Sequence, residues 1–101
     1  MAAWSSTTTA SALALLKVDL GILNSTAYDT RLTALINASV SAVIREGVST
    51  LSDSAEDMQM IVMYAGWLWR KRDTGDGVPR NLRWMLNNRI MSEKASASEG
   101  S

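Results

Sequence analysis

The stretch DSAEDMQMIVMYAGWLWRKRDTGDGVPRNLRWMLNNRI, residues 53–90, decides the fold, because it holds two helical patterns separated by a loop. The first pattern can begin at Asp53 or Ser54, which are good N-terminal caps, and should end near Arg72. Its last turn is basic and complements the negative end of the helix dipole. The loop DTGDGVP supplies two glycines, and Pro79 suits the first turn of the next helix. The stretch therefore predicts two helices that fold back on each other.

The first of these two helices is apolar on two faces. One face is formed by Met58, Ile61, Val62, Ala65, Leu68 and Trp69, and the opposite face by Met60, Met63 and Trp67. A helix that is apolar nearly all round must be covered nearly all round. A central helix in the core of one subunit would explain the pattern, and so would a helix covered on one side by a neighbouring subunit, with methionines as adaptable contacts. We predict that Met60, Met63 and Trp67 form a subunit–subunit interface.

The residues before this stretch predict two further helices. The first runs from Thr9 to about Leu20, and the second runs from a cap at Ser25 or Thr26 to Gly47. Apolar residues of the second helix fall on one stripe, as expected for an amphipathic helix: Tyr28, Leu32, Leu35, Ile36, Val40, Val43 and Ile44.

These patterns predict an all-α fold, a small bundle of about four helices with one short N-terminal helix, three longer ones and flexible termini. The length of 101 residues suits one domain. We expect residues 1–8 to be a flexible N-terminal segment and residues 9–92 to form the helical domain. The last helix should end near Glu93, and residues 93–101 form a small polar tail that cannot bury enough surface to fold alone.

The composition leaves few groups for catalysis. Without cysteine or histidine, the chain lacks the usual zinc ligands, the commonest general base near neutral pH and every thiol nucleophile. The carboxylates Asp53, Glu56 and Asp57 could hold a metal, but helix capping explains all three without one. We therefore predict no enzyme, no catalytic residue, no metal and no cofactor.

No segment predicts attachment to a membrane or secretion. Residues 60–69 form the longest apolar block, which has about half the length of a membrane span and ends in basic residues. The first 16 residues lack the basic start of a secretion signal. A soluble, intracellular protein is expected.

Charge is divided unevenly along the chain, although ten basic and ten acidic side chains cancel overall. Residues 1–66 carry three basic and six acidic side chains, whereas residues 67–92 carry six basic and two acidic ones. Such polarity suits a surface with a preferred partner better than a uniform coat for nucleic acid.

Aromatic and basic residues gather between residues 64 and 89, which hold three of the four tryptophans and six of the ten basic side chains. Such clusters occur where proteins hold nucleic acid and where subunits dock. We expect Trp67, Trp69 and Trp84 to meet in one aromatic corner whose basic rim binds a partner. A helix-turn-helix-like regulator that binds nucleic acid is the alternative, since Arg and Asn on the last helix are residue types that read bases. Two features disfavour this alternative. The loop before the last helix is longer than the usual turn of a helix-turn-helix, and the net charge of the chain is zero, whereas proteins that bind nucleic acid are normally basic.

Several motifs resemble the head-tail connector proteins of tailed bacteriophages and prophages, a group also described as putative DNA-packaging proteins. The similarity covers roughly residues 13–91, and the motifs are LLKVDLGI (15–22), AYDTRLTALINAS (27–39), IREGV (44–48), VMYAGWLWRKR (62–72) and VPRNLRWMLNNRI (78–90). The resemblance implies a structural adaptor subunit that forms a homo-oligomeric ring of twelve copies beneath the portal, extends the DNA channel and docks the next neck, stopper or tail-completion protein.

The resemblance also implies partners and a location. Double-stranded DNA would pass through the channel without sequence-specific binding, and no membrane is involved. The protein would act at the head-tail interface of the virion and reside in the host cytoplasm during assembly. We assign the portal or neck-protein interface to the polar and aromatic residues of the last two helices: Arg70, Arg72, Arg80, Arg83, Trp84, Asn87, Asn88 and Arg89.

Overall fold

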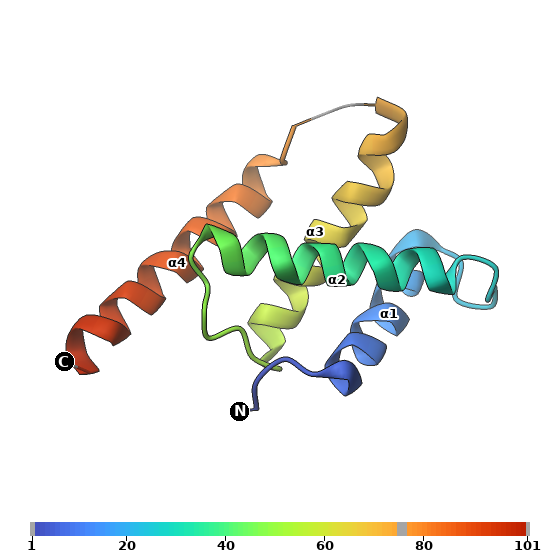
Figure 1. The fold of residues 1–101 in the computed structure, drawn as a ribbon. Helices are drawn as coiled ribbons and strands as arrows, with labels where there is room; N and C mark the ends of the chain where they lie inside the picture. Colours follow the sequence, from blue (N-terminus) through green and yellow to red (C-terminus); the bar gives the residue numbers. More distant parts are fainter. Residues whose placement is uncertain (1, 75–76, 101) are drawn as a thin grey trace.

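Four helices follow one another in the computed structural model, which describes residues 2–74 and 77–100, with the side chains of 72–74 and 96–100 excepted (Figure 1). They are α1 (Ser6–Leu20), α2 (Asp29–Glu46), α3 (Ala55–Thr74) and α4 (Arg80–Gly100). Over the described residues the prediction of an all-α bundle of about four helices, of which the N-terminal one is the shortest, is confirmed.

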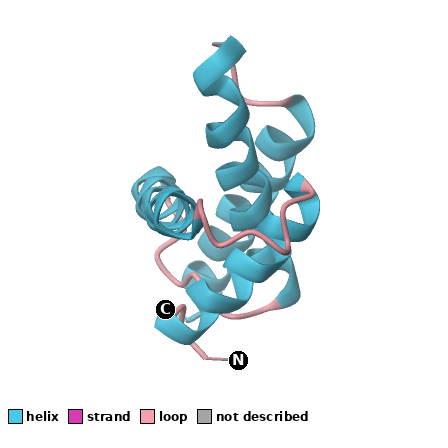
Figure 2. Ribbon diagram, turned by 90° about the vertical axis from the view of Figure 1, so that its right-hand side faces the viewer, coloured by secondary structure: helices cyan, strands magenta, loops and turns pink. Residues whose placement is uncertain are grey.

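The helices form two layers. α2 crosses one side of a layer that contains α1, α3 and α4, and Figure 2 shows α2 end-on beside the other three. Within that layer, α3 lies between α1 and α4 (Figure 1). α1 and α4 therefore form the two edges of this layer.

All four helices contribute to one apolar core. Its largest fully buried apolar side chains are Leu16 from α1, Leu32, Ile36 and Val43 from α2, Met60 and Ile61 from α3, Leu82 and Leu86 from α4, and Val48 from the loop after α2. α3 packs against each of the other three helices. It is the central helix, as one of the two interpretations of its apolar pattern required.

α1 begins earlier than the sequence predicts. Ser5 is the N-cap, and it forms a capping box with Thr8, in which each side chain bonds the backbone of the other residue. The backbone of residues 2–4 pairs with residues 51–53. α1 therefore starts three residues before Thr9, and the serine cap and the pairing with residues 51–53 hold the described part of segment 1–8 against the domain.

An ion pair joins the first two helices. Lys17 Nζ lies 2.8 Å from Asp29 Oδ1, and the Lys17 side chain is largely buried. α2 begins at Asp29, three to four residues after the expected cap, and no side chain caps it. Asp29 still lies in the first turn as predicted, where its charge meets the positive end of the helix.

The last helix continues past its predicted end. Residues 93–100 extend α4 through Gly100, so the polar tail predicted from residue 93 is helical as far as it is described. Glu93 is anchored to residues 49 and 50 in the loop before α3. This contact, which a sequence pattern does not reveal, explains why the helix is held beyond residue 92.

Candidate interaction surfaces

One side of α4 faces away from the core. Leu82 and Leu86 are buried, whereas residues half a turn away are exposed, and Trp84 has 69% of its surface exposed. Met91, which the sequence analysis did not single out, is 65% exposed. We call this surface the outer face of α4; it consists of Arg80, Trp84, Asn87, Asn88 and Met91. Exposed apolar side chains rimmed by polar ones are typical of interaction sites.

A second exposed apolar surface lies on α1. Leu15 and Val18 are each about half exposed, and the neighbouring Ser11 and Asp19 are exposed as well. We call these four residues the outer face of α1. The sequence held a signal for it, because Leu15 and Val18 fall outside the stripe that packs inward.

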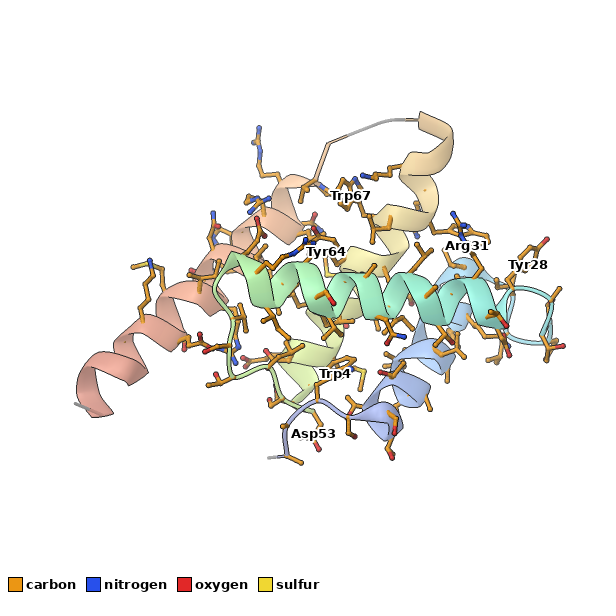
Figure 3. All side chains as sticks on the ribbon, in the orientation of Figure 1. Trp4, Tyr28, Arg31, Asp53, Tyr64 and Trp67 are labelled. Carbon is orange, nitrogen blue, oxygen red and sulfur yellow. The ribbon has the colours of Figure 1, made fainter. Side chains whose placement is uncertain are left out.

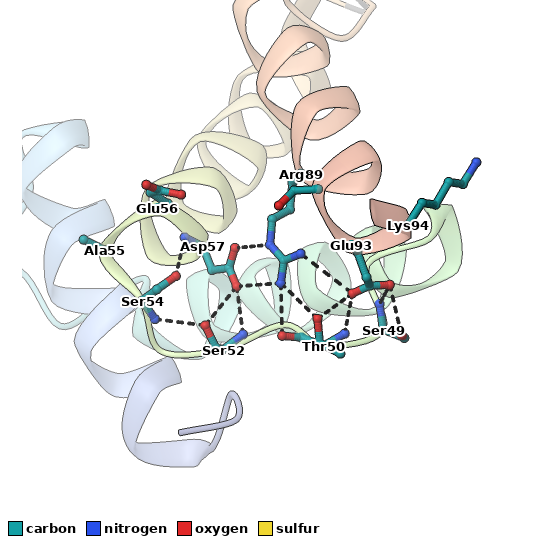
Figure 4. A pocket seen from close by; sticks show the side chains of 11 residues that line it. Ser49, Thr50, Ser52, Ser54, Ala55, Glu56, Asp57, Arg89, Glu93 and Lys94 are labelled. Atoms are coloured by element: carbon teal, nitrogen blue, oxygen red, sulfur yellow. Dashed lines mark hydrogen bonds and ion pairs between the residues drawn. The ribbon is translucent and has the colours of Figure 1, made fainter. Parts of the chain in front are cut away.

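Arg89 does not belong to either outer face. Its Nε lies 2.8 Å from Asp57 Oδ1, and its guanidinium also donates to the carbonyl oxygen of Thr50 at 3.1 Å (Figure 4). The side chain of Asp57 is 2% exposed and that of Arg89 19%. The hydrogen bond to Asp57 raises the pKa of Arg89 above its ordinary value. The structure contradicts the assignment of Arg89 to a partner surface, because its guanidinium is used inside the subunit.

Asp57 is the centre of this polar cluster. Its Oδ2 accepts hydrogen bonds from the backbone and the hydroxyl of Ser52, at 2.9 and 3.1 Å. The hydroxyl of Ser54 accepts from the backbone N–H of Asp57 and so caps the start of α3. Capping therefore explains only part of the role of Asp57, which also joins the loop before α3 to α4.

Glu93 occupies a site for a carboxylate in the same loop. The backbone and hydroxyl of Ser49 donate to Oε2 at 2.8 and 2.9 Å, and those of Thr50 donate to Oε1 at 2.7 and 2.6 Å. These residues line an open groove of about 1010 Å³ (Figure 4). The bonds attach the second half of α4 to the loop before α3.

We expect Glu93 to make stability depend on pH. Burial of the carboxyl raises its pKa, but hydrogen bonds from Thr50 and Ser49 outweigh burial and lower the pKa to about 2 from an ordinary 4.5. Because the folded-state pKa is depressed, this stabilisation is fully present above about pH 4.5 and is lost as the pH falls towards 2. Glu93→Gln should flatten that part of the pH dependence of the free energy of unfolding, measured by urea denaturation. An unaltered profile for Glu93→Gln would contradict the assignment.

The remaining basic residues divide into paired and exposed ones. Arg83 Nη1 lies 3.2 Å from Glu46 Oε1, in a pair that solvent reaches. Arg70, Lys71 and Arg80 are exposed at the ends of α3 and α4 that the loop joins, and we call them the basic corner. Lys71 Nζ lies 4.7 Å from the centre of the Trp67 ring. The side chain of Arg72, also assigned to the partner interface, lies outside the described residues.

The tryptophans do not form the single corner that the sequence predicts. Trp69 packs edge-on against Tyr28, with ring centres 5.5 Å apart. Trp67 packs against Tyr64, with ring centres 5.4 Å apart, and both of these residues are labelled in Figure 3. Positions two residues apart on a helix point in nearly opposite directions. Trp84 is on the outer face of α4, beside a groove of about 590 Å³ that Gln59 and Met60 also line.

The predicted subunit interface on α3 also requires correction. Met60 is 1% exposed and belongs to the core of its own subunit, since α4 covers that side of α3. Its assignment to an interface between subunits is contradicted. Met63 and Trp67 are half-buried and pack against the same core, and their role at an interface stays a prediction.

The part of the chain that the structure describes contains neither a cluster of metal-binding side chains nor a membrane-spanning helix. No group of three or more acidic side chains there could hold a metal ion. None of the helices, within the same residues, has the length and apolar character needed to cross a membrane. Comparisons with protein-family models, curated proteins and solved structures gave no significant match. The resemblance to phage connectors therefore depends on the quoted motifs alone.

Proposed function

We propose that this protein is a structural subunit of the head-tail connector of a tailed phage or prophage. Copies assemble into a ring under the portal, extend the DNA channel and dock the next neck or tail protein. The observation that carries the proposal is the exposure of apolar side chains on the two helices that flank α3, at Leu15 and Val18 on α1 and at Trp84 and Met91 on α4. A ring subunit needs two lateral contact surfaces of this kind.

The basic corner is suited to an axial contact. Arg70 and Lys71 of this corner can donate charge-assisted hydrogen bonds to carboxylates on the portal or the following neck protein. Arg83 and Arg89 already have carboxylate partners inside the subunit. These internal pairs lower the positive charge available to phosphates, which favours passage of DNA through the channel over tight binding.

The outer face of α4 also offers a test of the nucleic-acid alternative. Arg80, Asn87 and Asn88 are exposed and could read bases. The same face nevertheless exposes the large apolar side chains of Trp84 and Met91, which suit a protein contact better than a charged groove. We therefore favour the connector.

A binding experiment tests the proposal. The purified protein is mixed with the portal protein encoded by the same genome, and the masses of the complexes are measured by native mass spectrometry. We expect several copies to bind one portal, and Arg70→Glu with Lys71→Glu to weaken that binding strongly, because two attractive charges become repulsive. Arg45→Glu, at an exposed position of α2, is the control. Binding to a short DNA duplex that weakens steeply with salt, without portal binding, would support the regulator instead.

A further inference from the structure

The two outer faces share an unusual composition. From Ser6 to Leu16, α1 carries no charged side chain, and its first one that is exposed is Asp19. From Arg80 to Met91, the outer face of α4 carries one charge, that of Arg80, and the next exposed charge on this side is Lys94, one turn later. Exposed helix faces of monomeric proteins are normally rich in charged residues, so two nearly uncharged faces with protruding apolar side chains indicate contact surfaces.

The residue spacing on the two faces matches when the helices run in opposite directions. Asp19 and Leu15 are four residues apart, as are Arg80 and Trp84, a rise of about 6 Å in each helix. If Asp19 of one copy faces Arg80 of another, Leu15 faces Trp84. One further step of four residues places Ser11 opposite Asn88, two polar side chains that can share a hydrogen bond.

The neighbouring groove fits the same alignment. It is lined mainly by apolar surface and opens beside Trp84, between α4 and the first turns of α3, with Met60 and Met85 in its wall. An aliphatic side chain that lies over the Trp84 ring can cover this apolar wall. Leu15 and Val18 supply two such side chains on adjacent positions of the outer face of α1.

We propose that the outer face of α1 in one copy packs against the outer face of α4 in a second copy, with the two helices antiparallel. The opposite charges of Asp19 and Arg80 set the alignment, and Leu15, Val18 and Trp84 supply the buried apolar contact. Since α3 lies between α1 and α4 (Figure 1), one subunit can use both faces at once. The contact is heterologous, so copies add head to tail.

This pairing reassigns Arg80, Trp84 and Asn88 from the portal interface to a contact between copies. The pairing adds the contact between copies to the proposed function. It rests on that function only where the copies are said to close into a ring. The pairing of the two faces is measured on the protein alone, without a portal. A protein that pairs in this way but binds no portal would overturn the connector and leave the pairing intact.

Cross-linking tests the pairing, because the chain contains no cysteine of its own. Ser11→Cys and Asn88→Cys are made as separate variants, whose folding is checked by circular dichroism, and are treated with a short reagent that joins two thiols. We expect an equimolar mixture to give cross-linked dimers, with each variant alone giving far fewer. A chain carrying both cysteines should give a ladder of longer products. Ala38→Cys, at an exposed position of α2, replaces Ser11→Cys as the matched control.

Charge reversal provides the second measurement. Asp19→Arg alone should weaken association about fivefold in sedimentation experiments, and Asp19→Arg combined with Arg80→Asp should restore it. Cross-linking in the mixture that is no greater than in the control would overturn the proposal. Cross-linking of Asn88→Cys by itself to the same extent as in the mixture would also overturn it, because it would indicate a two-fold contact. Failure of the double charge variant to recover would overturn the Asp19–Arg80 alignment.

Discussion

Arg89→Ala is expected to lower the free energy of unfolding by about 3 kcal/mol, because it removes the charged partner of a carboxylate that is almost fully buried. Asp57 would keep its bonds from Ser52, but one carboxylate oxygen would lose the Arg89 Nε donor 2.8 Å away. For a domain of this size, the loss corresponds to a fall in melting temperature of about 15 °C, measurable by circular dichroism.

Arg83→Ala is the matched control for this experiment. It also removes an arginine of α4 from a carboxylate, but the Arg83–Glu46 pair is exposed to solvent on both sides. Exposed pairs contribute at most about 1 kcal/mol. If Arg89→Ala were no more destabilising than Arg83→Ala, the Asp57 cluster would not stabilise the packing of α4 against the loop before α3.

Met60→Glu is expected to unfold the domain or reduce it to a state without fixed packing. The side chain is 1% exposed and belongs to the apolar core, so a carboxylate placed there would be buried among apolar side chains. Burying an unpaired charge costs several kcal/mol, a large share of the 5–15 kcal/mol that stabilises a typical domain. Loss of the cooperative thermal transition, followed by circular dichroism, is the measurement.

Met91→Glu controls for the chemical change itself. Met91 is 65% exposed on α4, and a surface substitution of this kind should change stability by less than about 0.5 kcal/mol. A folded Met60→Glu protein that no longer self-associates would reverse our conclusion and return Met60 to an interface between copies.

Helical periodicity predicted the four helices, because that signal is local. Leu82 and Leu86 point inward and Trp84 outward as their spacing requires. Periodicity failed for Met60, because both sides of α3 are apolar and only the position of α4 shows which neighbour covers each side. The same limit applies to the tryptophans. Trp69 packs against Tyr28, Trp67 packs against Tyr64, and Trp84 is exposed on α4.

The polar contacts could not be predicted, because their partners are far apart in the sequence. Arg89 and Asp57 are 32 positions apart, and Glu93 lies 43 and 44 positions from Thr50 and Ser49. An arginine in a basic cluster gives no sign of whether its partner is inside the subunit or on another protein. The loop residues 49–52 gave no signal at all, since serine and threonine are ordinary loop residues.

The position of α3 between the two outer faces has a consequence for curvature. If the faces pair as proposed, each copy is rotated relative to the one before it by an angle that depends on how α1 and α4 are inclined inside the subunit. That inclination is fixed near the start of α4 by Leu82 and Leu86, and farther along by the hydrogen bonds that Glu93 accepts from the loop before α3. A shift of these internal contacts by a few degrees would accumulate from copy to copy. The number of copies that closes a circle would thus be decided by packing inside the subunit as much as by the surfaces that meet.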